Sequence, residues 1–240
     1  MAKPLSSLLP EMETRLAGWQ QLQYRLSHVK APKLRPTITI SREFGCEGFP
    51  LAERLKALFE ASSEEPWNIY DKTLLEKVAD EQGISMTLLQ GLGDMSRALD
   101  ALGLHPSGHV THDEAFAKVA KRLVQIAKVG NAVIVGRGGA ILCSHLRNCF
   151  HFRLEASFAW RVACMAKRLD VSMEEAEETV KINSKLRERF ISQSLGVDIR
   201  QVQYHDAIFN NERNDVEAIA QAIFAYVNTA WPSRERLPKG

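Results

Sequence analysis

Short apolar runs alternate with longer helical patterns along most of this chain. Runs rich in β-branched or aromatic residues predict strands, and apolar residues three and four apart predict helices. The predicted strands cover residues 37–40, 67–70, 132–135, 150–154 and 207–209. The predicted helices cover residues 51–60, 72–81, 113–128, 157–169, 172–194 and 216–227, and a glycine-interrupted helical pattern covers 88–102. This alternation predicts an α/β fold with a mostly parallel sheet and helices on both faces.

The first 36 residues differ in pattern from the rest. Residues 11–29 place apolar side chains on one helical face, and Pro32 and Pro36 mark a linker after them. We therefore divide the chain into an amphipathic helix with its linker (1–36), one α/β domain (37–230) and a C-terminal tail (231–240). The helix either covers the core of its own domain or pairs with a second subunit to form a homodimer.

Composition narrows the class of protein. The 240 residues are 45% hydrophobic with a formal net charge of +2, which allows a sizeable core and argues against a polybasic nucleic-acid-binding protein. Four scattered cysteines without a close C-x-x-C pair predict neither a zinc site nor a disulfide framework. No segment resembles a membrane span or a secretory signal. We expect a cytoplasmic protein that binds neither nucleic acid nor membrane.

The loop after the first predicted strand is a candidate phosphate site. A strand, a glycine-bearing loop and a helix start can bind an anion, because free backbone N–H groups and the helix dipole favour negative charge. The loop and its flanks read SREFGCEGFP over residues 41–50. Against the pattern G-x-x-x-x-G-K-[ST] with Gly48 as the last glycine, Phe49 occupies the lysine position and Pro50 the hydroxyl position. From these residues alone, a phosphate site and an ordinary tight turn remain alternatives.

Cations follow the third and fourth predicted strands. Arg137 lies in a Gly-Arg-Gly-Gly loop, where its guanidinium can grip a phosphate with two hydrogen bonds or pair with a carboxylate. The next two predicted helices carry several cations, including Arg161, Lys185 and Arg187. These helices either close over a polyphosphate as a lid or present an ordinary solvated face.

Three histidines give a separate hypothesis. His105, His109 and His112 have offsets of four and three, which would place their imidazoles on one helical face beside Asp113. Pro106 interrupts a helix at that point. We therefore predict no metal site, with zinc at these histidines as the alternative.

Several segments, in order along residues 37–228, resemble the cytidylate kinase-like proteins. The segments ITISREFG (38–45) and NIYDK (68–72) resemble the family's opening I-S-R-x-x-G-S-G-G motif and its tyrosine–aspartate step. The segments VIVGR (133–137) and FRLEAS (152–157) resemble its strand followed by Gly-Arg and its entry into the lid. The segments SKLR (184–187) and HDAI (205–208) stand where the family has D-K-x-R and a tyrosine–aspartate pair.

This resemblance implies a fold and a reaction. The fold is P-loop NTPase-like, with a five-stranded parallel sheet flanked by helices and a helical lid, to which this chain adds an N-terminal helix. The implied reaction moves the γ-phosphoryl of ATP, held with Mg²⁺, to a nucleoside monophosphate such as CMP. Carried over by position, the donor phosphates would be bound by Arg42, Gly45, Cys46, Glu47, Gly48 and Phe49. The acceptor would be bound by Asp71 and Arg137, and the transferring group by Arg161, Lys185 and Arg187.

The sequence departs from the family pattern inside the phosphate loop. Cys46 and Glu47 replace a small Ser-Gly pair, and a carboxylate ~4 Å from a phosphate would cost on the order of several kcal/mol. Ser184 replaces an aspartate, and Gly138 stands where cytidylate kinases have an aspartate. Two functions therefore stay open. One is an active kinase in which Arg42 partly substitutes for the lysine, and the other is a nucleotide- or partner-binding protein without catalysis.

Overall fold

The computed structural model describes residues 34–71, 112–198 and 200–236. The helices predicted at 11–29 and 72–81, and the helical pattern at 88–102, lie outside these residues. So do two of the three histidines of the zinc hypothesis, and the third begins a described helix. The division of the chain at residue 36 therefore stays a prediction.

Five parallel strands form one sheet in the order β2-β3-β1-β4-β5. The strands are β1 (Thr37–Arg42), β2 (Asn68–Asp71), β3 (Ala132–Val135), β4 (Cys149–Glu155) and β5 (Ala207–Asn210). β1 lies at the centre, with β3 on one side and β4 on the other. The predicted α/β fold and its five-stranded parallel sheet are confirmed.

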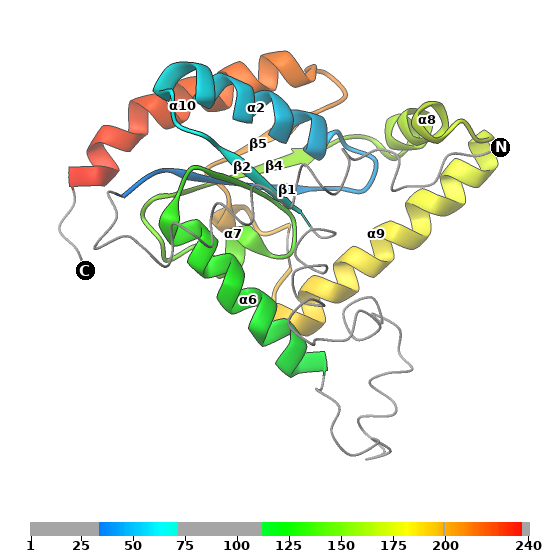
Figure 1. Cartoon of the computed structure of the whole chain (residues 1–240). Coiled ribbons are helices and arrows are strands. Elements are labelled where there is room, and N and C mark those ends of the chain that lie inside the picture. Colours follow the sequence, from blue (N-terminus) through cyan, green and yellow to red (C-terminus); the bar gives the residue numbers. More distant parts are fainter. Residues whose placement is uncertain (1–33, 72–111, 199, 237–240) are drawn as a thin grey trace.

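Helices cover both faces of this sheet (Figure 1). One face carries α2 (Gly48–Ser63) and α10 (Val216–Arg236), and the other carries α6 (His112–Val129) and the short helix α7 (Gly139–Leu142). Residues of β1 alternate between the faces: Ile38 and Ile40 join the core under α2 and α10, whereas Thr39 faces the other side and contacts His151 of β4. The alternation explains why a buried central strand carries threonines.

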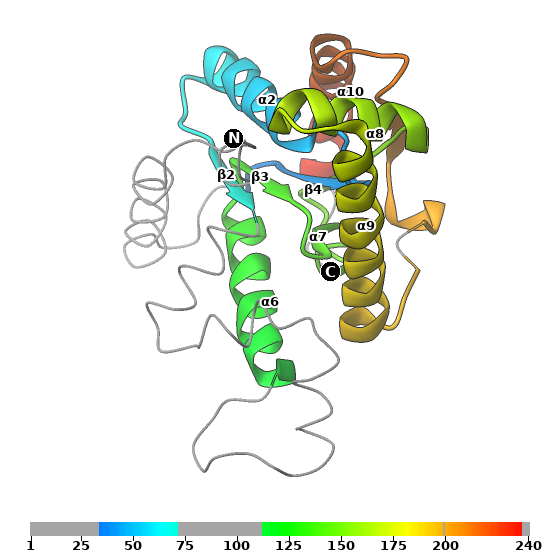
Figure 2. The same cartoon turned by 90° about the vertical axis from the view of Figure 1, so that its right-hand side faces the viewer.

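The helices α8 (Phe158–Leu169) and α9 (Met173–Leu195) stand beyond the sheet, and we call them the lid helices (Figure 2). Ser157 caps α8, and Ser172 with Glu175 forms a capping box at the start of α9. Such caps satisfy the free N–H groups of a helix start and contribute about 1 kcal/mol each. These local signals explain why the predicted helices 157–169 and 172–194 agree closely with the observed ones.

The last helix is longer than its sequence pattern suggests. We predicted residues 216–227, whereas α10 continues to Arg236 and contains Pro232. The extension is held by the sheet: Arg234 donates to the backbone oxygen of Cys149 (2.7 Å), pairs with Asp206 and lies over the ring of Phe150. Tertiary contacts thus carry the helix past a residue that usually breaks one.

Candidate phosphate-binding site

The loop from β1 to α2 turns tightly at Gly45 and packs against the lid. Gly45 has φ 101°, and a Cβ there would lie 2.7 Å from the Cβ of Arg161 on α8. Only glycine fits this conformation and this approach. Pro50 falls in the first turn of α2, where a missing N–H costs nothing, as the sequence predicts. The loop is therefore a tight strand-to-helix turn, and phosphate binding by it stays a prediction.

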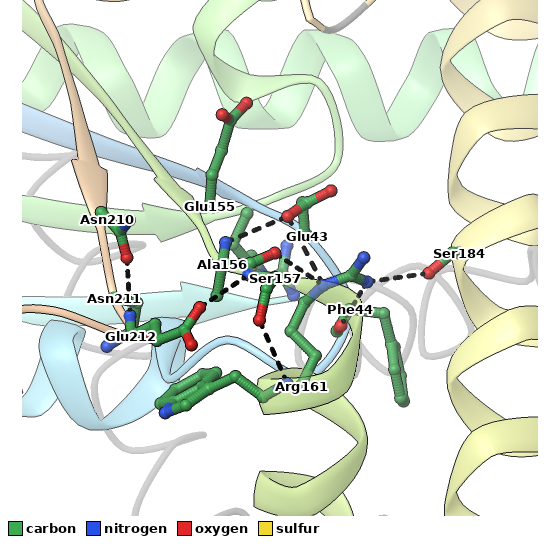
Figure 3. Close-up of polar contacts among 12 residues, drawn as sticks. Glu43, Phe44, Glu155, Ala156, Ser157, Arg161, Ser184, Asn210, Asn211 and Glu212 are labelled. Atoms are coloured by element: carbon green, nitrogen blue, oxygen red, sulfur yellow. Dashed lines mark hydrogen bonds and ion pairs between the residues drawn. The ribbon is translucent and has the colours of Figure 1, made fainter.

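Arg161 ties this loop to both lid helices (Figure 3). Its Nη1 donates to the backbone oxygen of Phe44 (3.1 Å) and to Ser184 of α9 (3.4 Å), and its Nε donates to the oxygen of Ala156 (3.2 Å). Glu43 lies 3.5 Å from the Arg161 Nε and accepts from the Ala156 N–H. Arg161 thus has loop contacts, and its assignment to the transferring group stays a prediction.

The carboxylate of Glu47 has a partner that the sequence analysis did not anticipate. Asn211, which follows β5 and is 3% exposed, accepts from the Glu47 N–H (2.8 Å) and donates to its carboxylate (3.3 Å). Burial of this asparagine side chain is therefore compensated at both ends. The contact depends on bringing β5 to the edge of the sheet, and only the paired asparagines after the last predicted strand hint at it in the sequence.

The side chain of Arg42 runs between two glycine-bearing loops. A Cβ at Gly48 would lie 3.2 Å from the Arg42 Cδ, and a Cβ at Gly136 would lie 1.9 Å from its Nη1. The guanidinium therefore reaches from the phosphate loop to the Gly-Arg loop after β3. The described residues offer this guanidinium no hydrogen-bond acceptor. An arginine placed in this way is available to an anion.

Two further arginines belong to the same cluster. Arg187 of α9 donates to the backbone oxygen of Arg42 (3.4 Å) and lies 4.9 Å from the centre of the Phe44 ring. Arg137 lies 4.7 Å from the ring centre of Phe190. Burial and the charge of Arg137 lower the pKa of Arg42 to about 10, and burial and Arg42 lower the pKa of Arg187. We call Arg42, Arg137 and Arg187 the arginine cluster.

The lysine and hydroxyl positions of the loop are occupied by the apolar residues Phe49 and Pro50. Phe49 is 8% exposed and belongs to the core, and Cys46 is also buried. Burial, with the charge of Glu43 beside it, raises the pKa of the Cys46 thiol to about 12, so it stays protonated at neutral pH. Neither side chain supplies a charge to a phosphate. If the loop binds one, its backbone N–H groups and the arginine cluster must do so.

One predicted site residue lies apart from the cluster, and another lies beside it. Lys185 is exposed on α9. Asp71 is 5% exposed at the end of β2 and is paired in register with Val135 of β3, so it lies beside the start of the Gly-Arg loop. The structure therefore brings together Arg42, Arg137, Arg161 and Arg187 but not Lys185, and the roles of all these residues stay predictions.

Magnesium fits the described residues less well than phosphate does. Magnesium binding needs carboxylate or hydroxyl oxygens beside the phosphates. At this edge of the described structure, Glu43, Glu47, Glu155 and Glu212 each have a partner for their carboxylate within the chain, and Asp71 at the end of β2 is not without a partner either. The described residues contain no group of three or more metal-binding side chains. The described residues therefore offer no all-protein cage for magnesium, and any Mg²⁺ here would depend on the phosphates for most of its ligands.

The parallel sheet, the strand-to-helix loop and the cationic lid define the class of P-loop kinase folds. The model of the cytidylate kinase-like family matches residues 37–213, and this chain belongs to that family. A cytidylate kinase from Pyrococcus horikoshii is 25% identical over 204 residues, which cover 84% of this chain and 93% of that protein.

One solved structure supports this fold, and a second is less similar. An uncharacterized protein from Eubacterium ventriosum superposes with a TM-score of 0.59 at 18% identity, covering 81% of this chain and 99% of the other. Shikimate kinase from Bacteroides thetaiotaomicron gives a TM-score of 0.45 at 12% identity, covering 80% and 98% of the two chains. The first of these likenesses supports the fold, and neither bears on the substrate.

Proposed function

We propose that this chain is a phosphotransferase that moves the γ-phosphoryl of ATP to a nucleoside monophosphate such as CMP. Family membership supports a kinase-like protein, and the related Pyrococcus protein is named a cytidylate kinase. The single observation that carries the proposal is the arginine cluster. Guanidinium groups from β1, the loop after β3 and α9 meet beside a phosphate-type loop.

These residues would act by positioning and by neutralising charge. Phosphoryl transfer needs the two substrates in line and the charge on the transferring oxygens balanced, with little covalent chemistry from the protein. The N-terminus of α2 and the loop N–H groups, apart from that of Glu47, which donates to Asn211, would bind the donor phosphates. Arg137 would hold the acceptor phosphate, and Arg187 would reach the transferring group from the lid. ATP as donor follows from the family, and no step here relies on a metal.

A second candidate is a nucleotide- or partner-binding protein without turnover. The observation that favours it is Phe49, which occupies the lysine position and is buried in the core. Such a protein would bind a nucleotide and leave it intact.

Turnover separates the two candidates. We expect the purified protein with ATP to phosphorylate at least one of the four common nucleoside monophosphates, measured by diphosphate formation. The Arg137→Met variant should lose about 100-fold in kcat, since removing one preorganised donor typically costs this much. Nucleotide binding without any diphosphate would contradict the kinase proposal and support the second candidate.

A matched control keeps this result specific. Arg54 lies on α2 and forms an ion pair with Glu217 at the protein surface. Its Nη2 donates to the Glu217 Oε1 at 2.9 Å. The Arg54→Met variant removes the same charge away from the site, so its kcat should stay within about twofold of the wild type.

The cellular location and the binding partners of this protein are also proposals. No helix among the described residues is long and apolar enough to cross a membrane. We propose a cytoplasmic protein with a nucleotide substrate and no nucleic-acid partner. Residues 1–36 would either cover their own domain or join two subunits, and sedimentation of the full chain would separate these arrangements.

A further inference from the structure

We infer that the arginine cluster takes the place of magnesium, so that polyphosphate anions bind this site without a divalent cation. The inference rests on the proposed function only in using the same phosphate site. It departs from the ATP–Mg²⁺ donor that the family implies, and it follows from where the cations and carboxylates of this chain lie.

Arg42 provides the first part of the argument. Its side chain passes Gly48 of the phosphate loop and ends against Gly136, directly before Arg137. A Cβ at Gly136 would collide with the guanidinium, so this path requires glycine there, whereas a Cβ at Gly48 would make only a tight contact with the arginine stem. The guanidinium therefore lies between the loop for the donor phosphates and the loop for the acceptor phosphate. Without Arg42, a lysine on α2 and a bound cation would be needed to neutralise phosphates between these two loops.

Arg187 provides the second part. It contacts the backbone of Arg42 and stacks on the ring of Phe44, so the lid brings a second guanidinium to the same loop. Phe44 is buried among apolar side chains of both lid helices, which fixes the ring on which Arg187 rests. Each of these two buried charges makes the other less favourable, so a bound anion would stabilise both. A polyphosphate supplies several negative charges in planar groups that match the guanidinium fork.

The carboxylates provide the third part. Glu47 is held by Asn211, Glu43 by the start of the lid, and Glu155 by Arg153 at 2.7 Å. In Figure 3, Glu155 points away from Arg161. The position of the loop hydroxyl is occupied by Pro50, which has none. Among the described residues, negative charge is thus engaged within the chain while positive charge faces the phosphate loop.

The test uses sodium tripolyphosphate as the probe, titrated by calorimetry into the full chain at constant ionic strength. One titration contains EDTA and the other contains excess Mg²⁺. We expect binding in EDTA at least as tight as in Mg²⁺, because magnesium neutralises the charge that the arginines recognise. Binding in EDTA that is absent, or about tenfold or more weaker than in Mg²⁺, overturns the inference.

Variants locate the binding. Arg42→Met and Arg187→Met should each weaken tripolyphosphate binding in EDTA by about tenfold or more, whereas the exposed control Arg54→Met should leave it within about twofold. Circular dichroism verifies that each variant is folded. Two folded variants that bind as tightly as the wild type would overturn the inference, because the anion would then bind elsewhere.

The outcomes also separate this inference from the proposed function. Tripolyphosphate binding in EDTA, with no phosphorylation of any nucleoside monophosphate, supports the inference and contradicts the kinase. Phosphorylation with ATP and Mg²⁺, but no binding in EDTA, supports the kinase and contradicts the inference.

Discussion

Replacing Arg42 by methionine should stabilise the protein when no anion is present. Burial lowers the pKa of Arg42 from 12.5 to about 10. A tenfold change in proton affinity corresponds to about 1.4 kcal/mol, so holding this charge costs the folded protein on the order of 3 kcal/mol at neutral pH. Methionine keeps much of the apolar stem that packs against Gly48. After allowing for lost contacts, we expect a net gain of about 1–2 kcal/mol.

The pH dependence of this gain has a definite sign. Because folding lowers the pKa of Arg42, both the folded and the unfolded chain carry the charge below about pH 10, and the cost is full there. The cost fades only as the pH rises above the folded pKa. The stability difference between Arg42→Met and the wild type should therefore be the same at pH 6 and pH 9.

Urea unfolding followed by circular dichroism measures the effect. A gain of about 1–2 kcal/mol raises the urea midpoint by roughly 0.5 M for a domain of this size. Tripolyphosphate at 100 times its Kd should add about 2.7 kcal/mol to the wild type and much less to the variant, which reverses their order. A variant that is less stable than the wild type without anion would refute the reasoning, since Arg42 would then be a structural residue.

Three further changes test other parts of the site. Gly45→Ala should lower the free energy of unfolding in urea by about 2–4 kcal/mol, because φ is 101° there and the new Cβ would lie 2.7 Å from the Arg161 Cβ on α8. Gly196→Ala is the control, because the space around Gly196 is open, and it should lower the free energy of unfolding by only about 1 kcal/mol. Asn211→Ala should weaken tripolyphosphate binding about threefold to tenfold by releasing Glu47, and adding Glu47→Gln should restore it; no recovery would contradict this role. Burial lowers the pKa of His151 to about 4, so the wild type should lose about 2 kcal/mol more than His151→Asn between pH 7 and pH 5, and parallel profiles would contradict this.

The sequence predicts the sheet well because its strands follow a simple physical pattern. The run Ala132–Val135 is apolar throughout and forms a strand that is buried on both faces. The caps of the lid helices are equally local, since Ser157 and Ser172 need only their own first turns. The sequence pattern alone therefore predicts those elements whose structure depends on residues close by in the chain.

Contacts across the fold could not be predicted in this way. The path of Arg42 depends on Gly136, which follows β3, a strand that pairs with β1 only once the sheet has formed. The Glu47–Asn211 pair likewise joins the loop after the central strand β1 to the residue that follows the edge strand β5. From the sequence, Glu47 is a charge that faces the phosphates, but its carboxylate instead accepts a hydrogen bond from Asn211. The sequence identifies these residues as candidates, but the order of the strands in the sheet determines which of them are in contact.

The loss of the loop lysine and the placement of Arg42 have a common physical origin. A lysine on α2 would sit where Phe49 is, but Phe49 is buried and fastens the start of that helix to the core. Moving the cation to the end of β1 anchors it on the strand that is hydrogen-bonded on both sides. An arginine fixed there loses little entropy when an anion binds, and it costs folding energy whenever the anion is absent. Tight anion binding and low stability of the free protein should therefore rise and fall together in variants of this loop.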